Sequence, residues 1–202
     1  MSVLCIIQAR LGSERLPRKV LMDIDGRPLI SHVVQRACGI RGVDTFVLAV
    51  PHAEAGMFAS NVVHVCGPEV PENDVLARFA AVSNFYPQHD TIMRVTGDCP
   101  LLNPRVAEAV LKLYRECHAW YAWNVYPGYT DGEDVEVFSR SALVRANELA
   151  IDPKDREHVT PWIRRTYPVV TLKPTVTGQR KTSVDTQEDL DYVRSLYAQQ
   201  SV

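Results

Sequence analysis

Short apolar runs alternate along this chain with longer segments in which apolar residues recur at helical spacing. The runs lie at residues 3–8, 45–50, 62–65 and 91–95. Strands that alternate with helices are typical of an α/β fold with a mainly parallel sheet. The alternation therefore predicts a three-layer α/β sandwich whose sheet is mixed but mainly parallel.

The segment 104–117 carries the clearest helix signal. Pro104 suits the first turn, and Asn103 before it suits the N-cap. Apolar residues then repeat at helical spacing as far as Cys117. The same reasoning predicts helices at 28–39, 74–85, 140–150, 154–165 and from 186 onward, and further strands at 20–24 and 134–138. Two more short strands are expected before the last helix, one of them ending at Asp185.

Length and composition fit one ordinary globular domain, residues 1–202. Of these residues 46% are hydrophobic, and the formal net charge is −2. This balance gives no electrostatic reason to expect nucleic acid or an anionic membrane as partner. The opening apolar run, Val3 to Ile7, is too short for a secretion signal or a membrane span. The five cysteines form no CxxC pair, which favours buried thiols in a reducing compartment, so we expect a cytoplasmic protein.

The loop after the first strand concentrates positive charge. Its sequence, ARLGSERLPRK (9–19), holds four cations, Arg10, Arg15, Arg18 and Lys19, against one acid, Glu14. Loops at the carboxyl ends of such strands open onto the ligand crevice, and arginine and lysine side chains suit phosphate. Gly12 lets backbone amides approach an anion, and Ser13 adds a hydroxyl donor. The loop therefore indicates a polyphosphate ligand; the alternative is a solvated basic loop, because the spacing is neither Walker A nor GxGxxG.

The stretch IIQARLGSERLPRKVLMDIDGRPLISHVV (6–34) resembles the opening of the sugar-activating cytidylyltransferases. That superfamily includes the 3-deoxy-manno-octulosonate and acylneuraminate cytidylyltransferases and the spore coat polysaccharide biosynthesis branch. In these enzymes the loop wraps the CTP phosphates, and its lysine stabilises the reacting phosphate. Carried over by position, the resemblance implies these roles for Arg10, Gly12, Ser13, Arg15 and Lys19. Arg18 falls where the family often has glycine.

The resemblance extends along nearly the whole chain. Five further motifs match the spore coat branch in order and spacing: ENDVLARF (72–79), VTGDCPLL (95–102), TDGEDVEVF (130–138), REHVTPWI (156–163) and SVDTQEDL (183–190). They imply a fold like that of the nucleotide-diphospho-sugar transferases, with a nucleotide-binding half at about 1–117 and an acceptor-binding half at about 118–202. The implied reaction moves CMP from CTP to an acidic, sugar-like acceptor and releases pyrophosphate. Relatives often dimerise, so a homodimer is expected.

Two aspartates are candidate ligands for one Mg²⁺. Asp98 follows a strand in Thr-Gly-Asp-Cys-Pro, and Asp185 precedes the last helix. Mg²⁺ takes one or two carboxylates together with substrate phosphate oxygens and water, and aspartates at these motif positions bind metal in the related enzymes. The alternative for Asp98 is an Asx turn. The alternative for Asp185 is a helix-entry residue beside a capping arrangement of Thr186 and Asp189.

Base recognition is expected from the backbone of the phosphate loop, including Leu11, and from the start of the 74–85 helix. Asp74 and Arg78 lie four positions apart on one helix face, so they could instead form a surface ion pair. In the family this region and the residue at Thr96 lie near the base or ribose.

The acceptor end is read from six polar residues. They are Asn124, Asp131, Asp134, Glu136, Glu157 and His158. Strand alternation places Asp134 and Glu136 on one face, which could equally be a solvent-exposed polar face, and a lone helical histidine is often a surface residue. Because these acids would repel a carboxylate, we expect them to bind acceptor hydroxyls or an amine, while His158, a backbone amide or Mg²⁺ meets the carboxylate.

Three alternatives stay open on sequence alone. The enzyme could use another nucleotide, it could use a phosphonate or phosphosugar acceptor, or the chain could be a non-catalytic module that binds nucleotide or sugar acid. The presence of Lys19, Asp98 and Asp185 together argues against a non-catalytic module, because a site that no longer catalyses a reaction has no need of buried charge. The aromatic residues between 120 and 129 could serve either a dimer contact or the core.

Overall fold

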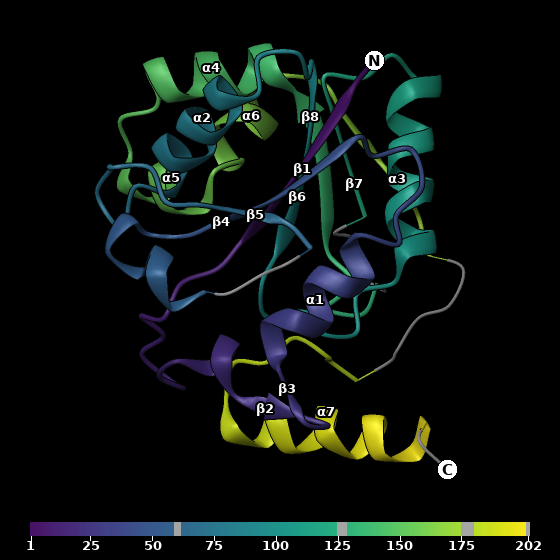
Figure 1. Cartoon of the computed structure of the whole chain (residues 1–202). Coiled ribbons are helices and arrows are strands. Elements are labelled where there is room, and N and C mark those ends of the chain that lie inside the picture. The colour runs from purple at the N-terminus through teal and green to yellow at the C-terminus, as the bar shows by residue number, and fades with distance from the viewer. Residues whose placement is uncertain (59–61, 125–128, 175–179, 201–202) are drawn as a thin grey trace.

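The computed structural model describes residues 1–58, 62–124, 129–174 and 180–200. Its centre is a seven-stranded sheet in the order β5-β4-β1-β6-β8-β7-β9 (Figure 1). The strands are β1 (Val3–Gln8), β4 (Thr45–Ala49), β5 (His64–Cys66), β6 (Thr91–Thr96), β7 (Tyr121–Trp123), β8 (Val135–Ser139) and β9 (Val169–Thr171). Strand β8 pairs antiparallel with β6 and β7, and the other described pairs in this sheet are parallel. The predicted mixed, mainly parallel sheet is confirmed.

Helices cover both faces of the sheet, which gives the expected three layers. One face is covered by α1 (Leu29–Ala37) and α3 (Pro104–Glu116), and α7 (Gln187–Gln200) adds apolar side chains to the same core from one end of the molecule. The other is covered by α2 (Val75–Phe85), α4 (Arg140–Leu149), α5 (Pro153–His158) and α6 (Pro161–Thr166). Strand β1 shows why two cores form: Val3, Cys5 and Ile7 enter the first, whereas Leu4 and Ile6 enter the second. Successive side chains of a strand point to opposite faces, so an unbroken apolar run can be buried on both.

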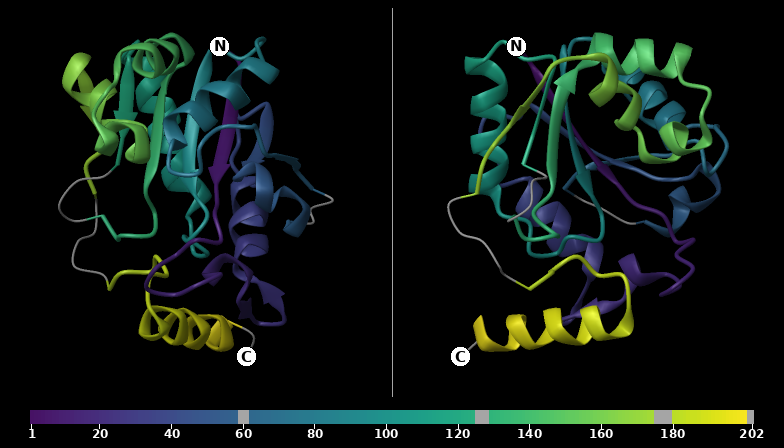
Figure 2. Two further views of the ribbon diagram at one scale, coloured as in Figure 1. Left: turned by 90° about the vertical axis from the view of Figure 1, so that its left-hand side faces the viewer. Right: turned by 180° about the vertical axis from the view of Figure 1, so that it is seen from behind.

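Smaller elements lie at the edges of these layers. They are the 3₁₀ helices η1 (Lys19–Leu21) and η2 (His52–Met57) and a hairpin of β2 (Asp23–Ile24) and β3 (Arg27–Pro28). Helix α7 lies across one end of the molecule beside this hairpin and away from α4 (Figure 2). Arg194 of α7 donates to the Asp23 carbonyl at 2.8 Å, so the end of the chain is held against the segment that follows the first loop.

Three predicted elements differ from the structure. The strand expected at 20–24 begins as η1, which includes Val20 and Leu21, and only Asp23 and Ile24 pair as a strand. The helix expected at 154–165 is two helices, because Val159 has a positive φ of 70° and Pro161 starts a new helix. No strand ends at Asp185 within the described residues 180–186.

The aromatic stretch serves the core in part. Tyr121 is fully buried, while Trp120 is 45% exposed and stacks on Tyr167 with ring centroids 4.7 Å apart. Tyr126 and the expected Pro127-Gly128 turn lie outside the described residues.

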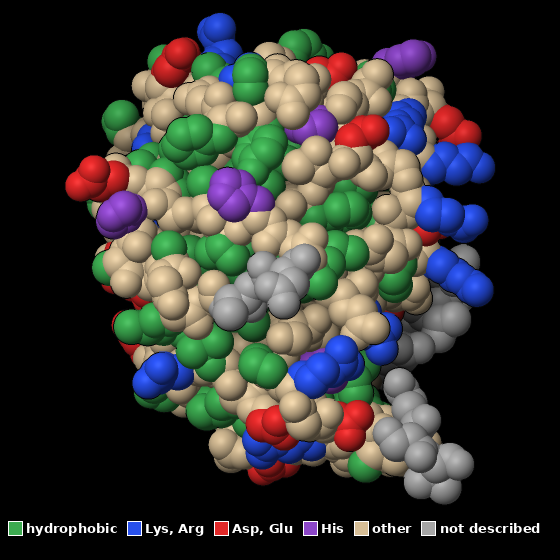
Figure 3. Space-filling view, in the orientation of Figure 1, with side chains coloured by type: hydrophobic (Ala, Val, Ile, Leu, Met, Phe, Trp, Pro, Cys, Tyr) green, Lys and Arg blue, Asp and Glu red, His purple; other side chains and the backbone are tan. Residues whose placement is uncertain are grey.

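The outer surface mixes charges of both signs. On the face shown in Figure 3, basic side chains gather along the edge over α3 with acidic side chains between them. On α3 itself, Glu108 forms an ion pair with Arg41, whose nitrogen atom lies 2.9 Å from the carboxylate oxygen. In the described part of the chain, no helix combines the length and apolar character needed to cross a membrane.

Candidate active site

A cleft of about 1010 Å³ opens over the carboxyl ends of β1 and β6. The first loop, the start of α2, the residues that follow β6 and one side of α5 line it, together with Asp185. The carboxyl ends of parallel strands are where α/β sheets place their ligands. The topology therefore brings the basic loop and the two aspartates, which are far apart in sequence, to one cleft.

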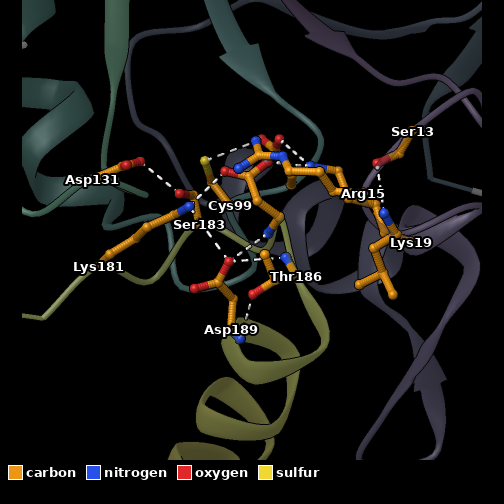
Figure 4. A network of polar contacts seen from close by, with 12 residues as sticks. Ser13, Arg15, Lys19, Cys99, Asp131, Lys181, Ser183, Thr186 and Asp189 are labelled. Atoms are coloured by element: carbon orange, nitrogen blue, oxygen red, sulfur yellow. Dashed lines mark hydrogen bonds and ion pairs between the residues drawn. The ribbon is translucent and has the colours of Figure 1, made fainter.

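Lys19 lies between Asp98 and Asp185 in this cleft. Figure 4 shows it in a network of polar contacts that also includes Arg15 and Lys181. Its Nζ atom donates to one carboxylate oxygen of Asp98 at 2.8 Å and to one of Asp185 at 2.9 Å. The Lys19 side chain is only 11% exposed. Two further cations reach Asp185, namely Arg15 at 3.1 Å and Lys181 at 2.5 Å. The site is therefore a compact network of alternating charge.

The charges of this network hold one another in the ionised state. Burial by itself lowers the pKa of Lys19, but Asp98 and Asp185 outweigh burial and raise it above its usual range. Burial alone would raise the pKa of Asp185, but hydrogen bonds from Lys181 and Lys19 hold it well below the ordinary value.

The turn before Lys19 explains a departure from the family pattern. Arg18 has φ 56° and ψ 24°, which is the left-handed region. Glycine adopts this conformation without steric cost, whereas other residues rarely do. The family's frequent glycine at this position therefore matches the backbone that delivers the lysine into the cleft.

Asp98 is delivered by a tight exit from β6. The Gly97 amide donates to the Gln8 carbonyl at 2.7 Å, and a Cβ atom on Gly97 would lie 2.7 Å from that same oxygen. Only glycine allows this close approach of β6 to β1. The exit turns the carboxylate of Asp98 toward Lys19, where a simple Asx turn would have engaged a local amide.

Asp185 is placed by two sets of backbone contacts. The Val184 amide donates to the Asp98 carbonyl at 2.9 Å, which ties the entry of α7 to the exit of β6. Asp189 accepts from the Asp185 and Thr186 amides, each at 2.9 Å, and its own amide donates to the Thr186 hydroxyl at 3.3 Å. The expected capping arrangement is thus present, and it leaves the carboxylate of Asp185 free for Lys19.

Acidic side chains face the backbone of the first loop. The Leu11 amide donates to a Glu54 carboxylate oxygen at 2.8 Å, and a Cβ atom on Gly12 would lie 2.8 Å from a Glu72 oxygen. Ser13 accepts from the Leu16 amide at 3.4 Å, so its hydroxyl helps to shape the loop. An anionic ligand would compete with these two glutamates for the loop's donors.

The residues expected near the base occupy different environments. Thr96 lines the cleft, and Asp74 lines it while capping α2 through the Ala77 amide at 2.9 Å. Arg78 has no exposed surface, lies outside the cleft lining and donates to the Glu72 carbonyl at 2.6 Å. The alternative of a surface pair between Asp74 and Arg78 is wrong, because Arg78 is buried and Asp74 pairs with Arg156 at 2.7 Å.

The residues expected at the acceptor end do not form one cluster. Glu157 lines the cleft and pairs with Arg10 at 3.4 Å, whereas His158 is exposed and outside the lining. Asn124 is buried and bonds the backbone of Glu133 and Val135, so its amide shapes the entry to β8. Asp131 accepts from the Ser183 hydroxyl at 2.6 Å and thereby joins the β8 entry to the segment before Asp185.

Glu136 lies inside the protein and not on a polar face. It is 5% exposed and pairs with Arg94 of β6. The Tyr121 and Thr160 hydroxyls donate to its other carboxylate oxygen at 2.5 and 2.6 Å. Burial would raise the pKa of Glu136, but Arg94 outweighs it and the pKa is lowered, so the carboxylate is ionised. The alternative of a solvent-exposed face is wrong for this residue, and its carboxylate is already occupied.

Sequence reasoning missed several residues that the fold brings to the site. Gln8, Arg94 and Arg156 line the cleft, and Lys181 contacts Asp185. A usable signal existed for Arg94, which is a charged residue inside an otherwise apolar strand and two positions before Thr96 on the same face. Lys181 gave no comparable signal, because only the packing of the α7 entry brings it to the aspartate.

The titration of Asp134 should change how the free energy of unfolding depends on pH. Burial, followed by the Asp131 carboxylate, raises its pKa from 3.8 to about 6. Between those values the folded chain holds a proton that the unfolded chain releases, so the free energy of unfolding falls as pH rises through this window. Asp134→Asn should remove that fall and stabilise the protein at neutral pH by about 1–2 kcal/mol, after discounting for partial exposure. Urea unfolding from about pH 4 to about pH 7 measures it.

The matched control for this prediction is Asp191→Asn on the exposed surface of α7, which should leave the pH profile of the wild type unchanged. If the Asp134→Asn and wild-type proteins lose stability equally over the window, Asp134 is not the group responsible.

The fold is shared with proteins of known structure. A cytidylyltransferase from Leptospira borgpetersenii serovar Hardjo-bovis superposes with a TM-score of 0.85 at 22% identity, covering 98% of this chain and 87% of that one. The CMP:2-keto-3-deoxy-manno-octonic acid synthetase complexed with CTP gives a TM-score of 0.78 at 21% identity, covering 99% and 100%. The chain thus has the same α/β fold as these two proteins.

Sequence comparison shows the family to which the chain belongs. The model of a family described as cytidylyltransferase matches residues 4–202, and the chain belongs to this family. An uncharacterised protein of Methanocaldococcus jannaschii is 32% identical over 168 residues, which are 81% of this chain and 67% of the relative. The 3-deoxy-manno-octulosonate cytidylyltransferase of Anaeromyxobacter dehalogenans is 38% identical over 112 residues, 54% of this chain and 46% of that enzyme. The chain therefore matches just under half the length of that enzyme. The resemblance to sugar-activating cytidylyltransferases is confirmed.

Proposed function

We propose that this protein transfers CMP from CTP to an acidic, sugar-like acceptor in an Mg²⁺-dependent reaction that releases pyrophosphate. The observation that carries the proposal is the position of Lys19, within 2.9 Å of both Asp98 and Asp185 at the carboxyl ends of β1 and β6. A buried cation between two carboxylates in an open cleft is costly to maintain without a ligand to act upon. Family membership supplies the nucleotide class.

In the proposed reaction a hydroxyl oxygen of the acceptor attacks the α-phosphorus of CTP. The new phosphorus–oxygen bond forms as the bond to the leaving pyrophosphate breaks, and the hydroxyl proton is released to water. Lys19 stabilises charge on the reacting phosphate, while Arg10 and Arg15 hold the outer phosphates. Such a displacement needs no covalent intermediate on the protein, because positioning and preorganised charge supply the rate.

The carboxylates of Asp98 and Asp185 fit Mg²⁺. Both approach the single Nζ atom of Lys19, so they converge on one region of the cleft. Among the described residues, no group of three or more His, Cys, Asp or Glu side chains could hold a metal by itself. A pair of carboxylates completed by phosphate oxygens and water is the ligand set that Mg²⁺ accepts. Bound there, the ion would neutralise charge on the substrate phosphates.

An acidic acceptor is supported by the relatives named 3-deoxy-manno-octulosonate cytidylyltransferases. Of the six acceptor candidates, Glu157 is the one that lines the cleft, so we assign it to the acceptor hydroxyls. Glu157 also lies 3.4 Å from Arg10, so it would contact the phosphate loop as well as the acceptor.

Nucleotide specificity tests the proposal directly. Pyrophosphate release should be measured with each of the four ribonucleoside triphosphates against a panel of 2-keto sugar acids and phosphonates. CTP should exceed the other nucleotides on the order of 10²-fold or more in kcat/KM, because a site built to hydrogen-bond one base leaves polar groups unpaired with another. Equal release with UTP or GTP would contradict the assignment to CTP, and a Lys19→Ala preparation controls for contaminating activity.

A further inference from the structure

Arg94 is a cation on the floor of the cleft that the proposed reaction has not yet used. It lies on β6 two residues before Thr96, and its side chain is 17% exposed. Gln8 of β1 lies beside it in the cleft lining, and the Arg94 Nε atom donates to the Gln8 side-chain oxygen at 3.3 Å. The guanidinium is therefore largely buried but reaches the open space.

A buried carboxylate fixes the orientation of this guanidinium. Arg94 donates through Nη1 to Glu136, which is itself held by Tyr121 and Thr160. A buried ion pair of this kind is often no more stabilising than an apolar pair of similar volume. The Arg94–Glu136 pair is therefore better explained by a role of the guanidinium in binding a ligand in the cleft than by a contribution to the stability of the fold.

Arg94 keeps N–H donors that are unpaired among the described residues, whereas Arg156, another cation that lines the cleft, does not. A guanidinium has five N–H donors, and all three nitrogens of Arg156 already bond to Asp74, Asn147 and Ala150. The Nη2 atom of Arg94 has no partner among the described residues, and it is not one of their buried unsatisfied atoms. Its N–H groups are therefore free to bind a ligand in the cleft.

The location of Arg94 favours the acceptor over the nucleotide phosphates. Arg10, Arg15 and Lys19 of the first loop already supply cations for the phosphates. Arg94 pairs in register with Glu136 of β8, and β8 adjoins β6 on the edge that faces away from β1 and β4. An acidic acceptor entering a cleft that carries Glu72, Asp74 and Glu157 needs a cation of its own.

We propose that Arg94 binds the carboxylate of the acceptor and thereby selects acids over neutral sugars, with Glu136 as the residue that positions it. The inference rests on the proposed function and deepens it. A planar guanidinium with free N–H groups matches a carboxylate in geometry and charge, which lysine at the same position does not. This also resolves how an acceptor carboxylate can bind among acidic residues.

The test compares an acid with its neutral counterpart. Binding of 3-deoxy-manno-octulosonate and of its carboxamide is measured by calorimetry in the wild type, in Arg94→Lys and in the double variant Arg94→Gln/Glu136→Gln. The wild type should prefer the acid on the order of 10²-fold, and both variants should lose most of that preference. The double variant removes both buried charges together, so neither is left uncompensated.

One control variant and the possible results complete the test. Arg41→Lys, at the surface ion pair with Glu108, should keep the wild-type preference. An unchanged preference in the Arg94 variants, or no preference in the wild type, would overturn the role of Arg94, as would an effect confined to the affinity for CTP. Acid binding that depends on Arg94 without pyrophosphate release would instead count against the proposed reaction and leave the carboxylate site standing.

Discussion

Replacing Lys19 with alanine should lower kcat on the order of 10²- to 10³-fold while KM for CTP changes by less than about tenfold. The reason is that Lys19 sits at the point where Asp98 and Asp185 converge, which is where the reacting phosphate is proposed to bind. A fixed positive charge there helps most when negative charge redistributes in the transition state. Steady-state kinetics at varied CTP and saturating acceptor measures both constants.

Two comparisons sharpen this expectation. Lys112→Ala, which removes an exposed lysine that pairs with Glu116 on the surface of α3, should leave both constants unchanged. Arg10→Ala and Arg15→Ala should mainly raise KM for CTP, because these arginines are assigned to the outer phosphates. Normal turnover of Lys19→Ala at saturating CTP would refute this division of labour.

Asp98→Asn and Asp185→Asn should each reduce turnover on the order of 10²-fold or more. The amide keeps the shape of the side chain but removes the charge that would hold Mg²⁺. The double variant should lose far less than the product of the single losses, because both residues are proposed to act on one ion. The Mg²⁺ concentration for half-maximal activity should rise in each single variant, and titration of Mg²⁺ at fixed CTP checks it.

The result for Asp185→Asn distinguishes two roles of Asp185, which are binding Mg²⁺ and forming the ion pairs at the entry of α7. Asp191→Asn on α7 is the matched control, since that carboxylate is exposed and contacts Gln187 and Arg194 on its own helix. If Asp185→Asn keeps near-normal activity and Mg²⁺ dependence, the residue serves only the ion pairs at the entry of α7.

The sequence alone determined the layers and the approximate positions of the main elements. The apolar run at β1 and the capped, periodic segment at α3 were placed correctly because their signals are local. The position of the basic loop also followed from the sequence, since a loop after a parallel strand must open at the carboxyl edge of the sheet. Glycine at 97 and the pair Thr186 and Asp189 were likewise readable, because backbone approach and helix capping depend on neighbouring residues.

Only the tertiary structure decided which charges meet and which are buried. Lys19 and Asp185 are 166 positions apart, and they meet because the entry of α7 is bonded to the exit of β6. Glu136 and Arg78 carry the residue types of a solvated surface, yet neighbouring helices and strands cover both. The cost of burying a charge depends on its partner, and that partner is supplied by another element at long range. Arg94 is one such case, because its partner Glu136 is supplied by the pairing of β8 with β6.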